Sequence, residues 1–101
     1  MGKMAQYLVE RRIFEVSKRL RRARDELAVA DEQLSALAEA ADEARIRSLV
    51  SETPLAVKES QEATRNAEAM QGARDSLVSQ VKRLEAELDE LLDKLVPGTG
   101  T

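Results

Sequence analysis

Two runs of mostly apolar residues mirror each other across Glu52 in this chain. Each run advances by alternating steps of three and four residues, which places its members along one face of an α-helix. We call these positions the seam: Val9, Ile13, Val16, Leu20, Ala23, Leu27, Ala30, Leu34, Leu37, Ala41, Ala44 and Ser48, then Ala56, Ser60, Ala63, Ala67, Met70, Arg74, Leu77, Val81, Leu84, Leu88, Leu91 and Leu95. Positions paired from the turn outward, such as 34 with 70 and 20 with 84, always add to 104. A chain that reverses at Glu52 would therefore set seam residue against seam residue.

This symmetry predicts an all-α fold, a long antiparallel two-helix coiled-coil hairpin. Between Ala5 and Val50 there is neither proline nor glycine to break a helix. Thr53 followed by Pro54 is typical of a helix N-cap with proline at the first helical position. We expect a flexible N-terminus over 1–4, a hairpin over 5–96 made of helix 5–50, turn 51–53 and helix 54–96, and a flexible tail over 97–101.

The seam changes in size along the predicted hairpin. Large residues such as Val16, Leu20 and Leu84 fill the end that carries the termini, whereas alanines such as Ala41 and Ala63 fill the end near the turn. Burying a large aliphatic side chain contributes about 1.5–3 kcal/mol, and alanine contributes much less. We therefore expect the large layers to hold the helices together and the turn end to fray first.

Two residues interrupt the pattern of the second helix. Arg74 occupies a seam position opposite Ala30. It is interpreted either as a buried charge that sets the register or as a side chain that crosses the alanine and places its guanidinium in water. Gly72 is interpreted either as a hinge or as an exposed glycine that the helix tolerates.

Composition narrows the chemistry available to the chain. Charged residues make up 35% and aromatic residues 2%, which is typical of long helices rather than of a packed globule. The chain has neither histidine nor cysteine, and a two-helix hairpin has no pocket, so we expect no enzyme, no catalytic residues, no cofactor and no metal. No run of residues is apolar enough to span a membrane, and we expect a cytoplasmic protein.

The residues around the turn form the first candidate site. Five aliphatic residues near it lie off the seam: Ile46, Leu49, Val50, Leu55 and Val57. Glu52 caps this group, and Arg45, Arg47 and Lys58 surround it. An exposed apolar patch on a polar protein commonly marks a partner site. The alternative is that these residues pack on one another and fasten the turn.

A basic segment, residues 11–24, forms the second candidate. Residues 1–24 hold eight Lys or Arg against two Glu, a local charge of +6, although the whole chain carries −3. Lys18, Arg21 and Arg22 are expected to face outward and to meet nucleic acid or another anionic surface. Alternatively, the acidic residues of segment 80–93 neutralise the basic segment, with Arg19 near Glu87.

The sides of the predicted hairpin carry further apolar residues, among them Phe14, Val29 and Leu92. Two hairpins that covered these residues mutually would form a four-helix bundle, so we expect a homodimer. The principal prediction is a non-enzymatic interaction, scaffold or adaptor protein that binds an unidentified protein partner through the residues around the turn.

Acidic residues on both predicted helices suggest one more alternative: Asp42, Glu43, Glu59 and Glu62. Together with the long hairpin they resemble, in architecture, the bacterial transcript-cleavage factors that enter the channel of RNA polymerase. That resemblance implies a polymerase channel-binding coiled-coil factor whose acidic residues hold Mg²⁺ at the turn. In this chain the turn itself carries Glu52 alone.

Overall fold

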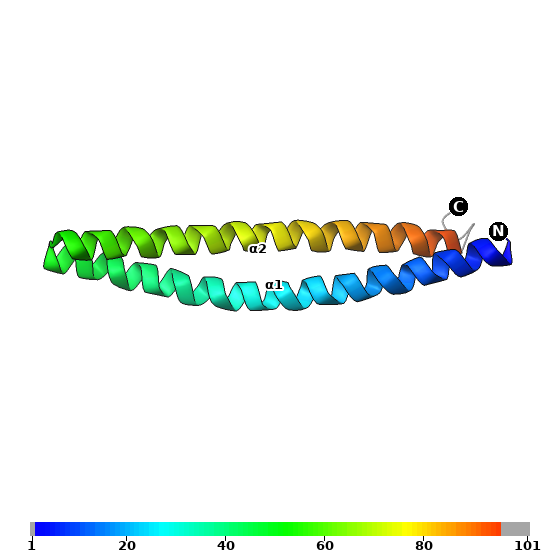
Figure 1. The fold of residues 1–101 in the computed structure, drawn as a ribbon, viewed down its shortest axis with the longest axis horizontal. Coiled ribbons are helices and arrows are strands. Elements are labelled where there is room, and N and C mark those ends of the chain that lie inside the picture. The colour runs from blue at the N-terminus through cyan, green and yellow to red at the C-terminus, as the bar shows by residue number, and fades with distance from the viewer. Residues whose placement is uncertain (1, 96–101) are drawn as a thin grey trace. The chain divides into compact units, whose positions relative to one another are not determined.

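The chain consists of two long α-helices in the computed structural model, which describes residues 2–95 (Figure 1). Helix α1 spans Lys3–Ser51 and contains 49 residues, and α2 spans Pro54–Leu95 and contains 42. No strand occurs in the described part of the chain, so the predicted all-α class is confirmed. Helix α1 begins two residues before the expected Ala5. The predicted end of the second helix at residue 96 and the predicted tail lie outside the described residues.

The helical chain is grouped into two compact units, and the single hairpin domain expected from the sequence stays a prediction. The terminal unit comprises, within the described residues, 2–26 of α1 and 77–95 of α2. The turn unit comprises residues 27–76 and contains the link between the helices. Each unit has its own interhelical contacts.

Burial follows the seam along both helices. Every seam position is buried or half-buried, and almost every other described residue is exposed. Four positions off the seam are also half-buried, all of them in the terminal unit: Arg12, Ser17, Val78 and Glu87. The heptad spacing therefore identified the packed face of each helix residue by residue.

The terminal unit holds the larger core. Val16 and Ala23 of α1 are almost completely buried, and they form one cluster with Leu20, Leu84 and Leu91. In Figure 1 the blue start of α1 accordingly lies beside the orange end of α2. Half-buried seam residues extend this cluster: Val9, Ile13, Val81 and Leu88.

Two ion pairs cross between the helices of the terminal unit. Arg12 Nε donates to Glu87 Oε1 at 3.0 Å, and Arg24 donates from its guanidinium to Glu85 Oε2 at 2.9 Å. In both pairs α1 supplies the arginine and α2 supplies the glutamate. The apolar cluster holds the two helices of this unit together, and these ion pairs help to set the orientation of one helix against the other.

The turn unit has a thinner core. Ala30 and Ala44 are its only fully buried hydrophobic residues among those described, and both are small. Leu34 and Leu37 remain half-buried. The predicted contrast in size between the layers near the termini and those near the turn is therefore present in the burial of the two units.

Candidate functional site

The link between the helices is short and held by capping interactions. Thr53 Oγ1 accepts a hydrogen bond from the Ala56 amide at 3.1 Å, which makes Thr53 the N-cap of α2 as predicted. Glu52 donates its amide to the Ser48 carbonyl at 3.0 Å and has a φ of 55°. This left-handed conformation, which usually favours glycine after a helix, ends α1 and reverses the chain.

All five aliphatic residues predicted around the turn are exposed, and we call them the apolar tip. Their exposed fractions are 57% for Ile46, 70% for Leu49, 81% for Val50, 65% for Leu55 and 44% for Val57. Leu49 and Val50 therefore bury little of their surface against other side chains, and the alternative, in which these residues pack on one another to fasten the turn, stays a prediction compatible with a partner site. Reversal through only two non-helical residues leaves these side chains on surfaces that the opposite helix does not cover.

Charged side chains surround the apolar tip. Arg45 lies 3.9 Å from Asp42 on the same helix, a distance that gives a weak contact between two exposed groups. Within residues 2–95, neither Arg47 nor Lys58 is in an ion pair, and Glu52 is exposed. The tip therefore combines unpaired cations with exposed aliphatic carbon.

The basic segment is only partly neutralised by α2. Glu87 is bound by Arg12, so the expected contact of Arg19 with Glu87 is wrong. Arg12 lies seven residues before Arg19 on α1, about two helical turns, and it is half-buried while its guanidinium reaches Glu87 on α2. The hydrogen bond that Arg12 donates to Glu87, followed by the charge of that carboxylate, raises the pKa of Arg12 above its ordinary value. The folded chain therefore holds this proton more firmly than the unfolded chain does, and that contribution to stability is lost only above the ordinary pKa.

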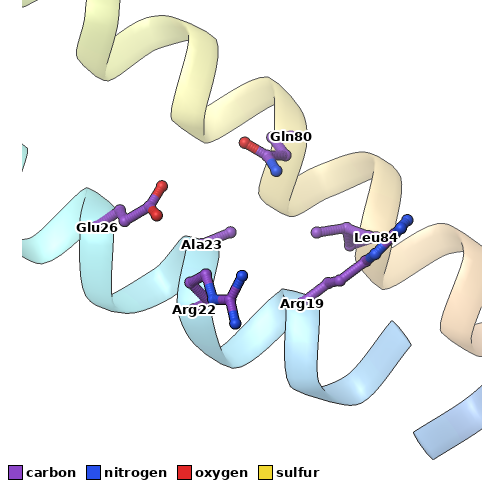
Figure 2. Close-up of a pocket in the computed structure, with 6 residues that line it drawn as sticks. All are labelled: Arg19, Arg22, Ala23, Glu26, Gln80 and Leu84. Carbon is purple, nitrogen blue, oxygen red and sulfur yellow. The ribbon is translucent and has the colours of Figure 1, made fainter. Parts of the chain in front are cut away.

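The centre of the basic segment has no acidic partner in the described part of the chain. Lys18, Arg21 and Arg22 are exposed and in no ion pair, as is Arg19. A shallow groove of about 220 Å³ lies beside two of them (Figure 2). Arg19, Arg22, Ala23 and Glu26 of α1 and Gln80 and Leu84 of α2 line it.

Exposed apolar residues accompany these cations on α1. Phe14 is 66% exposed, and Lys18 Nζ lies 5.5 Å from the centre of its ring. Met4, Tyr7 and Leu8, which the sequence analysis did not single out as a site, are each more than half exposed. Their recurrence every three or four residues outside the seam was the signal that could have identified them.

Arg74 fits neither of its two sequence interpretations fully. Its side chain is 35% exposed, and its Nε donates to Asp31 Oδ1 on α1 at 2.8 Å. The hydrogen bond that Arg74 donates to Asp31, followed by the charge of that carboxylate, raises the pKa of Arg74 above the ordinary value. Arg74 is therefore a half-buried cation held by an interhelical partner.

Gly72 is exposed, and a methyl group added to it would meet nothing within 4 Å. There is thus no close contact that requires glycine at this position. The interpretation as an exposed, tolerated glycine agrees with this geometry.

The acidic residues near the turn form no compact cluster. No group of three or more Asp or Glu side chains in residues 2–95 is arranged to hold a metal ion. The polymerase channel-binding factor implied by the resemblance to transcript-cleavage factors stays a prediction. Over the same residues, neither helix contains a stretch that is long and apolar enough to cross a lipid bilayer.

Fold and surface together define an all-α protein with two long helices, an apolar tip and a basic stretch on α1. Comparison with protein-family models, with curated proteins and with solved structures finds no significant match to this chain.

Proposed function

We propose that the chain is a non-enzymatic interaction protein, an antiparallel coiled-coil hairpin that binds a protein partner through its apolar tip. The observation that carries this proposal is the exposure of five aliphatic side chains around a two-residue link. Water-exposed aliphatic groups clustered in this way stabilise nothing within the chain. Covering them in a complex would remove apolar surface from water, the dominant favourable contribution to most protein association.

The charges around the tip indicate the chemistry of the partner. Arg47 and Lys58 are in no ion pair among the described residues, and Arg45 has only its distant contact with Asp42. A partner with an apolar groove edged by carboxylates would match both features. The aliphatic residues would occupy the groove, and the cations would orient the complex at its rim.

The conformation of Glu52 supports a site at the link. A glutamate at a φ of 55° is strained, and glycine would adopt that conformation freely. Strained residues are concentrated at functional sites. Glu52 belongs to the link between the two helices that carry the tip, and it is exposed, so a partner bound at the tip would be able to contact it.

The direct test is affinity capture from the native cell with the wild-type chain and with a Leu49→Asp, Leu55→Asp double variant. Both side chains are at least 65% exposed, so the double variant should fold with unchanged helicity. We expect it to lose the proteins that the wild type retains. Retention of the same proteins by the double variant would contradict the proposal.

A control for the type of substitution is Val29→Asp, which places one aspartate, against two in the double variant, at an aliphatic residue 52% exposed on α1 of the same unit. Val29 lies about 30 Å along the helix from Leu49, at about 1.5 Å per residue. This variant should retain the partners. Light scattering of all three proteins tests whether the tip instead binds a second copy, because a tip-mediated dimer would dissociate only in the double variant.

The homodimer expected from the sequence, with two hairpins forming a four-helix bundle, remains a prediction. The cytoplasmic location remains one as well. Neither is required for binding through the apolar tip.

A further inference from the structure

A second exposed stripe runs along α1 outside the seam, in the terminal unit. Its members are spaced by three and four residues, so they share one face of the helix. Three are apolar or aromatic and three are cationic: Met4, Tyr7, Arg11, Phe14, Lys18 and Arg21. We call these six residues the outer stripe. It is distinct from the seam of the same helix, which is covered by α2.

The apolar members of the outer stripe are strongly exposed, at 72% for Met4, 56% for Tyr7 and 66% for Phe14. Leu8, next to the stripe, is 57% exposed. Lys18 lies over the Phe14 ring, so cation and aromatic group form one surface. Nothing in the described part of the chain covers these side chains.

Most of the positive charge on the cationic members is not neutralised by carboxylates of the described residues. Arg11 contacts Glu15 at 3.6 Å, but both side chains are about half exposed or more, so this contact neutralises the stripe weakly. Lys18 and Arg21 have no ion pair among residues 2–95, and neither does the adjacent Arg22. No carboxylate belongs to the stripe itself.

We propose that the outer stripe binds the surface of an anionic lipid bilayer, with α1 lying parallel to the membrane plane. Apolar side chains that share one exposed helix face with Lys and Arg are suited to the boundary between headgroups and acyl chains. Met4, Tyr7 and Phe14 enter that boundary. Arg11, Lys18 and Arg21 contact the headgroup phosphates and carboxylates.

Two other occupants fit the stripe less well. A second copy of the chain would bring cations of one stripe against cations or apolar groups of the other, and unpaired charges in an interface are costly. A nucleic acid would satisfy the cations through its phosphates but would leave Met4 and Leu8 uncovered. An anionic bilayer accommodates both kinds of side chain.

The native chain contains a probe of this binding. Tyr7 is its one tyrosine, and it has no tryptophan, so the intrinsic fluorescence reports on the outer stripe. The protein is mixed with vesicles of phosphatidylcholine alone, or of phosphatidylcholine and phosphatidylserine in equal parts. We expect sedimentation with the anionic vesicles alone, protection of Tyr7 from acrylamide quenching, and release as salt rises.

Paired variants test the two halves of the stripe. Lys18→Glu should weaken binding to anionic vesicles by at least about fivefold, whereas Arg65→Glu, the same change at an exposed arginine of the turn unit, should weaken it less. Phe14→Ser should weaken binding by about tenfold, and Val29→Ser should leave it unchanged. Circular dichroism of each variant verifies that helicity is retained.

Several outcomes would overturn the proposal. These are absence of binding to anionic vesicles, equal binding to both vesicle types, or equal effects of Phe14→Ser and Val29→Ser. Binding to a duplex oligonucleotide that is insensitive to Phe14→Ser, without vesicle binding, would assign the cations to nucleic acid instead. Because the apolar tip belongs to another unit, the Leu49→Asp, Leu55→Asp variant should bind vesicles as the wild type does.

Discussion

Arg74 of α2 donates a hydrogen bond from Nε to Oδ1 of Asp31 on α1, at 2.8 Å. It is the one ion pair that joins the two helices of the turn unit among the described residues. The fully buried apolar residues of this unit are small alanines. We therefore expect the Arg74–Asp31 contact to help set the register of the two helices here, as larger apolar residues do in the terminal unit.

The Arg74–Asp31 contact should be measurable as a coupling between the two residues. We expect Asp31→Ala and Arg74→Ala to lower the free energy of unfolding by amounts that do not add in the double variant, because each removes the same interaction. The coupling should shrink as salt rises, since both groups are partly exposed. Urea unfolding at low and high salt measures it. Arg65→Ala is the control, and additive effects of Asp31→Ala and Arg74→Ala would show that the contact is not formed.

The terminal unit should carry most of the stability. Leu84 is 8% exposed within the apolar cluster, and Leu84→Ala should lower the free energy of unfolding by about 2–3 kcal/mol. Leu34→Ala, the same change at a half-buried position of the turn unit, should cost about 1 kcal/mol. Denaturant unfolding compares the two. Equal losses would contradict the difference in core size.

Amide hydrogen exchange tests the same contrast without substitution. Amides of the turn unit should exchange faster than those around Val16 and Leu20, because local opening there exposes less apolar surface. Uniform protection along α1 would argue against fraying from the turn.

Gly72→Ala should raise the free energy of unfolding by about 1 kcal/mol, because alanine restricts the unfolded chain more and has a higher helix propensity. The added methyl group meets no atom within 4 Å, so no steric cost offsets this gain. Thermal unfolding followed by circular dichroism measures the change. A lower melting temperature would mean that Gly72 has a role, such as a hinge, that its exposed position does not reveal.

Glu52→Gly should also stabilise the chain, by about 1 kcal/mol, because glycine adopts a φ of 55° without strain. Ser51→Gly, one residue earlier at the end of α1, is the matched control and should destabilise it. If both glycines had the same effect, the left-handed conformation would not be confined to Glu52. Partner capture with Glu52→Gly then separates the role of the carboxylate in binding from its effect on stability.

The periodicity of the sequence predicted the packed face of each helix, and Thr53 with Pro54 predicted the start of α2. Both features depend on local backbone geometry, which can be inferred from the spacing and type of neighbouring residues. The residue spacing did not predict that Arg12 is the partner of Glu87. Heptad positions place backbones opposite one another, but a long arginine side chain can reach a carboxylate that is not directly opposite it. The exposure of Leu49 and Val50 also needed the structure, because it depends on how the chain reverses at Glu52.

The most direct test of the central claim, that the chain reverses at Glu52 and presents an apolar tip, is a distance across the turn unit. The chain has no native cysteine, so Glu32→Cys and Ala73→Cys provide two unique sites for spin labels at exposed positions of the turn unit and leave the Arg74–Asp31 contact in place. The fold predicts a short separation, set by helix axes about 8–10 Å apart plus the two labels. An unbroken helix would separate these sites, 41 residues apart in the sequence, by about 60 Å, and that distance would contradict the reversal and the apolar tip that depends on it.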